Sequence, residues 1–345
     1  MQSLNPHVIV FFGGHAGNAD LSRESALWFG TYVPRNKFQI TPVQIMPDGT
    51  WKVPLGSLPK TGPIQTMWQR LFEAIRPLSP AKALERLLSR PIDLMMTFVR
   101  GQGGDDGSLN LLGQTLQLPV FGSPTATAQI ASNKHLSMQM IGEMTGVPFT
   151  KLYKPHVAAE EIVDDITGYG LPQSFFVKPL MEEGSFGILK AQGKQDLAQA
   201  IEQTRESGDF VIQEDIPGTE ISVTLYEDAL GRLQALPATI IVPKKAAFYD
   251  HLAKRRAGRA LLHTPNSQDN VVIAEAEAIA RDIWTQLGCR DIASFDMVAG
   301  QDSVDVLEVN TVPTFTSATP TIGQFKAGAI HPTRLFDSMI RRRLL

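Results

Sequence analysis

The stretch that decides the fold is SFDMVAGQDSVDVLEVNTVP, Ser294–Pro313. It consists of two apolar runs with a turn near Asp302, and polar side chains interrupt the runs at Asp296, Glu308 and Asn310. If the runs pair as an antiparallel hairpin around that turn, Asp296 lies opposite Glu308, and the first residue of the stretch lies opposite Asn310. The two-residue period of a strand then places Glu308 and Asn310 on one face. The sequence therefore predicts three converging oxygen-bearing side chains.

Such a trio suggests a metal site. A buried carboxylate is costly unless a cation or hydrogen bonds compensate it, and an all-oxygen set without His or Cys suits Mg²⁺ or Mn²⁺ better than zinc. The alternative is a pair of solvated acids on an outer strand face. Flanking Val304, Val306 and Val309 favour burial, but the hairpin alone does not decide between the two interpretations.

A second stretch, FFVKPLMEEGSFGILKA, places Lys178 at the end of an apolar strand and follows it with a loop that contains Gly184, Ser185 and Gly187. The backbone N–H groups of such a loop can surround phosphates while the lysine neutralises their charge. The sequence contains neither GxxxxGK[ST] nor GxGxxG, so a P-loop is excluded and a dinucleotide fold is weakly supported. Taken alone, the loop is more often only a turn.

Length and composition indicate an ordinary soluble enzyme-sized protein. The 345 residues suggest two or three domains. A net charge of −3 with 19% charged residues points to neither nucleic acid nor an anionic membrane as a partner. The single cysteine, Cys289, excludes an internal disulfide, and the N-terminus lacks the pattern of a signal peptide, so a cytoplasmic location is expected. The run 341–343 is basic, and it is interpreted as a helix cap in preference to a recognition patch.

The order of the expected elements divides the chain. HVIVFFGG and IDLMMTF read as buried strands that lead into glycine-rich loops, with helices expected over SRESALWFGTYV, capped by Ser22, and from about Ser108; LPVFGS is expected to be a further strand. The first 125 residues or so are therefore α/β with a largely parallel sheet, and the ligand should lie beyond the strand ends. A small α+β module follows, and then two antiparallel hairpins separated by a long helix over NVVIAEAEAIARDIWTQLG.

Seven motifs carry a family resemblance through their order and spacing. The sequence resembles the ATP-grasp superfamily, and within it the D-alanine–D-alanine ligase family, over nearly its whole length. The motifs are VFFGGHAGNADLS, GQGGDDG, FGSPTATAQIASNKHLSMQM, FFVKPLMEEGSFGILK, VIQEDIPGTEISV, VPKKAAFYDHLAK and DMVAGQDSVDVLEVNTVPTFT.

The resemblance implies a three-domain ATP-grasp fold, α/β and α+β, whose first domain is built on a parallel sheet. The expected domains are an N-terminal substrate domain over 1–127, a central ATP-grasp lid over 128–212 and a C-terminal domain with the metal site over 213–345. It also implies that Asp296, Glu308 and Asn310 hold two Mg²⁺ ions, with Mn²⁺ as an alternative.

The same resemblance assigns the nucleotide site. Lys134 and Lys178 are expected to hold phosphates under the lid, and Lys254 is expected to contact the γ-phosphate. The remaining ATP contacts that it implies are the lid residues Glu183, Gly184, Ser185 and Gly187, the adenine-reading Gln213 and Ile216, the ribose-binding Glu220, and Phe248 and Leu307 on either side of the adenine.

The departures from the family pattern cluster on the amino-acid side. Asn18 stands where the family has a Glu that binds the ammonium group of the first amino acid. Arg100 replaces a His, and Gly184 replaces a Ser of the lid. Three changes affect the catalytic positions: Arg255 replaces a Tyr, Ser294 replaces the Arg that stabilises the oxyanion, and Thr314 replaces an oxyanion-hole Gly. Thr319 stands where the family has a Ser that anchors the carboxylate of the second substrate, and it keeps the hydroxyl. Lost oxyanion donors typically cost about 10²–10³ in rate.

The resulting prediction is an ADP-forming carboxylate–amine ligase that acts through an acyl phosphate on small molecules, with an acid other than D-alanine. The alternatives are a divergent D-alanine–D-alanine ligase and a nucleotide-binding pseudoenzyme. Which of Arg100 and Arg255 replaces the missing oxyanion Arg stays open, as do the substrates and the assembly state, for which a homodimer is one option.

Overall fold

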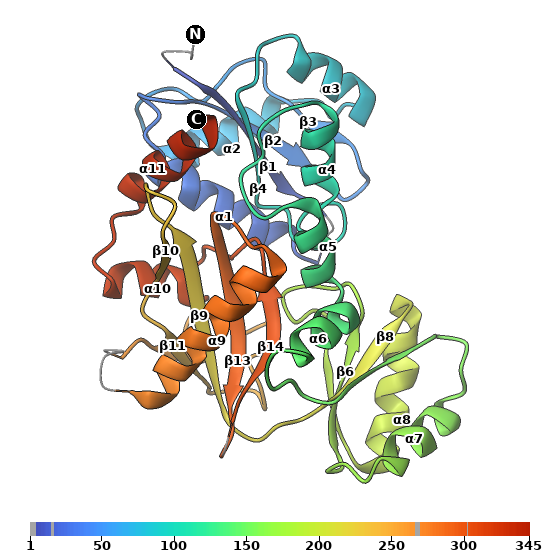
Figure 1. The fold of residues 1–345 in the computed structure, drawn as a ribbon. Helices are drawn as coiled ribbons and strands as arrows, with labels where there is room; N and C mark the ends of the chain where they lie inside the picture. The colour runs from blue at the N-terminus through green and yellow to red at the C-terminus, as the bar shows by residue number, and fades with distance from the viewer. Residues whose placement is uncertain (1–4, 15–16, 266–269, 302) are drawn as a thin grey trace.

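The computed structural model describes residues 5–14, 17–265, 270–301 and 303–345 and builds them around three sheets (Figure 1). One sheet belongs to the N-terminal part, a second to the middle of the chain and a third to the C-terminal part. Over these ranges, none of the helices has both the length and the apolar character that crossing a bilayer requires.

The N-terminal sheet has the order β3-β2-β1-β4. Strand β1 pairs in parallel with both β2 and β4, whereas the short β3 is antiparallel to β2. The predicted largely parallel sheet is thus confirmed. Its elements are β1 (His7–Gly13), α1 (Ala19–Tyr32), β2 (Gln39–Ile45), β3 (Trp51–Lys52), α2 (Ile64–Ala74), α3 (Pro80–Leu88), β4 (Leu94–Thr97) and α4 (Ser108–Thr115).

Two local predictions in this part are wrong. Helix α1 begins at Ala19, so Ser22 lies inside the helix, where its Oγ accepts a hydrogen bond from the N–H of Gly13 at 2.9 Å. LPVFGS forms a single bridge between Met95 and Val120 rather than a strand. In both cases the residue contacts a strand that the local pattern does not contain, β1 for Ser22 and β4 for Val120.

The central sheet is antiparallel, with the order β5-β8-β6-β7. Helices α7 and α8 pack together against it and enclose a separate apolar core (Figure 1). The elements that lead into and form this part are α5 (Thr125–Ser132), α6 (Lys134–Gly142), β5 (Thr150–Tyr153), α7 (Ala159–Gly168), β6 (Ser174–Pro179), β7 (Leu189–Gln192), α8 (Gly193–Thr204), the 3₁₀ turn η1 (Arg205–Ser207) and β8 (Phe210–Glu214).

The C-terminal sheet runs β12-β11-β9-β13-β14, with β10 paired to β9. Its elements are β9 (Thr219–Glu227), β10 (Leu233–Ala235), β11 (Thr239–Pro243), β12 (Ala260–His263), α9 (Val271–Leu287), β13 (Ile292–Ala299), β14 (Val304–Asn310), α10 (Pro320–Ala327) and α11 (Pro332–Leu344).

The hairpin of β13 and β14 has the predicted register. Asp296 pairs with Glu308 and Ser294 pairs with Asn310, and the register shifts immediately after Asp296. The predicted turn residue Asp302 lies outside the described residues. The two-residue period therefore located the polar side chains correctly.

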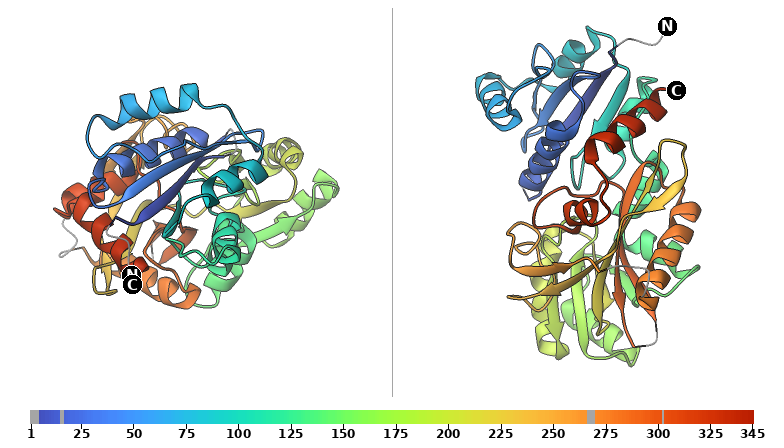
Figure 2. Two further views of the ribbon diagram at one scale, coloured as in Figure 1. Left: turned by 90° about the horizontal axis from the view of Figure 1, so that it is seen from above. Right: turned by 90° about the vertical axis from the view of Figure 1, so that its left-hand side faces the viewer.

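The C-terminal tail joins the first and third parts. Helix α11 lies beside the N-terminal sheet (Figure 2), and the Trp28 ring stacks on Phe315 with ring centroids 4.9 Å apart. Arg342 and Arg343 form ion pairs with the fully buried Asp291 at 2.6 and 2.7 Å. These arginines therefore do more than end their own helix, because they connect it to a distant buried acid.

The predicted domain limits stay a prediction. Helix α5 spans the limit at 127/128, and strand β8 spans the limit at 212/213. The core of the central sheet is separate, whereas the N-terminal sheet and the C-terminal tail share one apolar cluster.

Candidate active site

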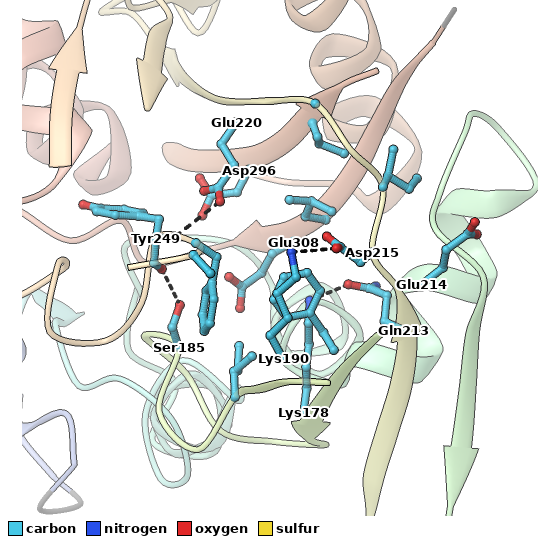
Figure 3. A pocket seen from close by; sticks show the side chains of 18 of the residues that line it. Lys178, Ser185, Lys190, Gln213, Glu214, Asp215, Glu220, Tyr249, Asp296 and Glu308 are labelled. Atoms are coloured by element: carbon cyan, nitrogen blue, oxygen red, sulfur yellow. Dashed lines mark hydrogen bonds and ion pairs between the residues drawn. The ribbon is translucent and has the colours of Figure 1, made fainter. Parts of the chain in front are cut away.

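A cavity of about 320 Å³ lies between the central and C-terminal sheets. It is within the usual size range of small-molecule sites. Figure 3 shows Glu220, Asp296 and Glu308 on one side of a space that Lys178 and Lys190 also approach, whereas Glu214 points away from it. Most of the predicted nucleotide residues line this large cavity: Lys134, Lys178, Ser185, Gln213, Ile216, Glu220, Phe248 and Leu307. The predicted Lys254, Asp296 and Glu308 line it as well.

Lysines occupy the side of the large cavity that the central part provides. Lys178 ends β6 and donates to the side-chain oxygen of Gln213 on β8, and Lys134 at the start of α6 donates to the carbonyl of Glu182. Burial is the main cause that lowers the pKa of Lys178 to about 8, with Lys134 adding to the effect and Glu308 opposing it. An anionic ligand favours the charged form of such a buried lysine and raises its pKa.

Carboxylates occupy the opposite side, on strands of the C-terminal sheet. Burial alone would raise the pKa of Glu308, but nearby cations, chiefly Lys254 and Lys134, lower it to about 2. Burial raises the pKa of Asp296 and of Glu220. The Nζ of Lys254 lies 3.9 Å from Asp296 Oδ2. The cavity is thus lined by cationic side chains on one side and by carboxylates on the other.

The lining residues that the sequence interpretation missed include Phe176, Lys190 and Asp215. The Phe176 ring meets Phe248 edge to face with centroids 5.1 Å apart, and Lys190 lies above Phe176 and pairs with Asp215 at 2.6 Å. The period of two was an available signal for Phe176, because it precedes Lys178 by two residues on β6. Its register partner on β7 is Lys190.

The lid loop between β6 and β7 holds the remaining predicted ATP residues. Gly184 and Gly187 have φ of +65° and +70°, a conformation that favours glycine. Ser185 Oγ donates to the carbonyl of Tyr249 at 3.3 Å, which ties the lid to the C-terminal part. Glu183 is buried and points to Arg100 rather than into the large cavity.

A second, smaller cavity of about 40 Å³ adjoins the first and shares Tyr249, Lys254 and Asp296 with it. The predicted catalytic and substrate residues Arg100, Ser294, Thr314 and Thr319 line this small cavity, together with Gly184 and Asn310. Thr319 Oγ1 donates to the carbonyl of Thr314 at 2.9 Å. The departures from the family pattern at these positions are therefore brought together in space.

Arg100 is the buried centre of this region. Its Nε lies 3.1 Å from Asp105 Oδ2, and its Nη2 donates to Glu183 Oε2 at 2.9 Å and to Asn310 Oδ1 at 2.6 Å. Its Nη1 donates to the carbonyl of Val312. The guanidinium thus connects the loop after β4, the lid and the end of β14.

Asn18 and Arg255 meet at the other side of the lid. Asn18 is 2% exposed; its Oδ1 accepts from Arg255 Nη2 at 3.1 Å, and its Nδ2 donates to the carbonyl of Glu183 at 3.2 Å. A Cβ on Gly184 would lie 2.8 Å from the same Oδ1. Arg255 also donates to the carbonyls of Gly17 and His251. Three substituted positions, Asn18, Gly184 and Arg255, therefore form one contact set.

Comparison with known proteins decides the family. The family model described as the D-ala D-ala ligase C-terminus matches residues 142–341, which include the lid, both hairpins and the lining of the large cavity apart from Lys134. The chain belongs to the D-alanine–D-alanine ligase family. As a member of this family it is an ATP-dependent ligase with the ATP-grasp fold, and the predicted family and fold are confirmed.

Individual D-alanine–D-alanine ligases are distant relatives of this chain. The ligase of Syntrophobacter fumaroxidans is 30% identical over 275 residues, 77% of this chain and 85% of that protein. D-alanine–D-alanine ligase A of Mesorhizobium japonicum is 26% identical over 98% of this chain and 97% of its own length. The chain therefore spans the family's full architecture.

Solved structures show the same fold. The VanG D-Ala:D-Ser ligase from Enterococcus faecalis superposes with a TM-score of 0.81 at 23% identity, covering 98% of this chain and 99% of its own. The Bacillus anthracis D-alanine–D-alanine ligase complexed with ATP gives a TM-score of 0.74 at 19% identity, covering 98% and 97%.

Proposed function

We propose that this ligase phosphorylates a carboxylic acid with ATP and joins the resulting acyl phosphate to an amine, and that the acid is not D-alanine. A carboxylate oxygen of the acid attacks the γ-phosphorus of ATP and ADP leaves. The amine then attacks the acyl carbon, the acyl–oxygen bond to phosphate breaks, and the nitrogen loses a proton. The products are an amide, ADP and phosphate.

The large cavity supports the nucleotide part of this proposal. Lys134, Lys178 and Lys254 would hold phosphate oxygens, because an ammonium is a compact point charge suited to that task. Phe248 and Leu307 would hold the adenine between them, and Gln213 and the Ile216 N–H would recognise its edge. Glu220 would accept hydrogen bonds from the ribose hydroxyls, and the lid residues Ser185 and Gly187 would cover the phosphates, whereas Glu183 pairs with Arg100.

Two carboxylates fit a divalent cation. Asp296 and Glu308 are paired across the β13–β14 hairpin and face the cavity that the lysines line. Among the described residues no group of three or more His, Cys, Asp and Glu side chains is placed to hold a metal, so phosphate oxygens of ATP would complete the coordination shell. Mg²⁺ or Mn²⁺ suits such a set, and when bound it would neutralise the charge of the transferred phosphoryl group.

The contacts of Asn18 support an acid without a free α-ammonium. Its amide oxygen and amide nitrogen are both used by the protein, on Arg255 and on the lid backbone. A neighbouring guanidinium repels an ammonium, and a neutral amide cannot compensate it. An N-blocked acid, or one that lacks the amine, avoids that cost. The VanG structure supports variation of substrate within the fold, since it is described as a D-Ala:D-Ser ligase.

The observation that carries the proposal is that Lys134 and Lys178 lie across the large cavity from Asp296 and Glu308, with Lys254 beside Asp296 and the small cavity adjoining. The direct test supplies ATP, Mg²⁺ and hydroxylamine with a panel of carboxylic acids. Hydroxylamine traps an acyl phosphate as a hydroxamate, so an acid-dependent hydroxamate with equimolar ADP is expected for some acid other than D-alanine. Product mass with candidate amines then identifies the second substrate.

Two rivals predict different outcomes of the same assay. A divergent D-alanine–D-alanine ligase, which the names of the relatives favour, would give ADP and the dipeptide with D-alanine alone. A nucleotide-binding pseudoenzyme, which the substitutions at Ser294 and Thr314 favour, would bind ATP and form no hydroxamate with any acid.

A further inference from the structure

Arg100 lies beside the predicted metal site. It follows β4 and is 6% exposed, and its guanidinium contacts Asp105, Glu183 and Asn310. The shortest of these three contacts joins Nη2 to Asn310 Oδ1 at 2.6 Å. The side-chain oxygen that the sequence assigned to a metal therefore already accepts from a permanent cation.

The orientation of the Asn310 amide follows from hydrogen-bond chemistry. A guanidinium has only donors, so the amide atom that faces Arg100 must be the oxygen. The amide nitrogen then faces the other way, and Nδ2 lies 3.5 Å from Asp296 Oδ2. On the side of Asp296, Asn310 consequently presents hydrogens rather than a lone pair.

In this orientation Asn310 cannot bind the same metal ion as the two carboxylates. An ion held by Asp296 and Glu308 would meet the NH₂ group of Asn310, which cannot coordinate a cation. A second ion placed on Asn310 Oδ1 would lie next to the guanidinium, which stays charged at any pH at which the protein is folded. Like charges at that spacing repel strongly in a buried site.

The surroundings of Arg100 fix it in this place. Asp105 Oδ1 accepts from the N–H of Gly101 at 2.6 Å while Oδ2 faces the guanidinium, so the loop after β4 orients its own counter-ion. Glu183 supplies a second carboxylate from the lid. The planar fork reaches four acceptors from three parts of the chain, which is a geometry that a lysine or histidine cannot reproduce.

We propose that the Arg100 guanidinium stands in for one of the two divalent cations that the family resemblance implies, so that this ligase binds a single divalent ion together with ATP. Asn310 then serves as the anchor of Arg100 instead of as a metal ligand. This inference rests on the proposed function, because the ion in question is the one that accompanies the nucleotide.

The test counts bound metal and does not require turnover. The protein is titrated with Mn²⁺ in the presence of a saturating β,γ-imido analogue of ATP, and free Mn²⁺ is measured by electron paramagnetic resonance. The expected stoichiometry is one Mn²⁺ per protein with the spectrum of an isolated ion. Two ions in the native protein, with the broadened spectrum of a coupled pair, would overturn the proposal.

The variant Arg100→His sharpens the count, because it restores the residue type that the resemblance predicts at this position. It removes the permanent charge, frees Asn310 Oδ1 and is expected to raise the stoichiometry to two. A single ion in an Arg100→His protein that still binds the analogue would contradict the proposal. Arg290→His, at an exposed arginine, is the matched control and is expected to stay at one.

The same titration tests the proposed function and the role of Arg100 separately. If the analogue does not bind to the native protein, the proposed function itself fails. If the analogue binds with two ions, the proposed function stands and only the role of Arg100 fails. Should Arg100→His not fold, the count on the native protein still decides the matter.

Discussion

The large and the small cavity adjoin each other but differ in how their polar groups are satisfied. In the large cavity, lysines of the central part lie opposite carboxylates of the C-terminal part (Figure 3), and Lys178 and Lys134 each donate only one hydrogen bond to the part of the chain that the structure describes, to Gln213 and to the carbonyl of Glu182. In the small cavity, Arg100 and Thr319 already bond to protein acceptors. One region is prepared for a highly charged ligand, and the other is largely closed by its own contacts.

The two cavities also differ in what the family resemblance expects of them. Most of the nucleotide residues that it implies line the large cavity, whereas the substitutions that it implies at Arg100, Ser294 and Thr314 line the small one. Removing charged groups from water costs free energy, and a charged ligand that binds between them can offset that cost. In the small cavity the charge of Arg100 is compensated by the protein itself, through Asp105 and Glu183.

The largest effect is expected from a substitution among the carboxylates that would bind the metal in the large cavity. Glu308→Gln removes a charged oxygen ligand while preserving shape, and ADP formation is expected to fall by about 10³-fold or more. Circular dichroism and the melting temperature should stay close to those of the native protein. Glu275→Gln on the exposed face of α9 is the matched control. Native turnover in Glu308→Gln would remove the carboxylate–metal assignment.

The next effect concerns the phosphate side. Lys178→Ala removes a charge-assisted contact worth about 1.5–3 kcal/mol, so the Kd for ATP measured by calorimetry is expected to rise by about 10- to 100-fold. Lys194→Ala, at an exposed lysine, should leave it unchanged. An unaltered Kd in Lys178→Ala would mean that Lys178 is only the end of a strand.

The pH dependence of ATP affinity sharpens the same point. The pKa of Lys178 in the free protein is lowered to about 8, so the side chain is charged below that pH and becomes neutral above it. ATP binding then requires uptake of a proton, and affinity is expected to fall by up to about tenfold per pH unit above pH 8. Lys178→Arg, which stays charged, should flatten the profile. A flat native profile between pH 7 and 9.5 would contradict this prediction.

The smallest effect tests the Asn18–Arg255 contact set. Gly184→Ala places a Cβ 2.8 Å from Asn18 Oδ1 at a φ of +65°, whereas Gly49→Ala has comparable strain at +81° with no atom within 4 Å. Both should lose about 1 kcal/mol of folding stability from backbone strain. Only Gly184→Ala should also raise KM for the acid by a few-fold, because it displaces Asn18. Equal acid KM values in the two variants would show that the contact set does not shape the substrate site.

Much of this comparison was predictable from the sequence, and the reasons differ by region. The β13–β14 register followed from a two-residue period, and the lining of the large cavity followed from motifs whose order is tied to the fold. Ser22, Asp291 with the C-terminal arginines, and the orientation of Arg100 were not predictable. Each depends on a partner from another element, and Arg100 and Asn310 are 210 residues apart in sequence. A local pattern contains no information about such a partner.

The most direct test of the central claim, a retained nucleotide site beside a changed acid site, is one assay with D-alanine. Purified protein is incubated with ATP, Mg²⁺ and D-alanine as the only amino acid, and ADP release is followed continuously. The products are identified by mass spectrometry. The account predicts ADP release near background, with turnover restored when the acid and amine found in the hydroxamate panel replace D-alanine. Formation of D-alanyl-D-alanine at about 1 s⁻¹ or faster, the lower end for ordinary enzymes, would contradict it.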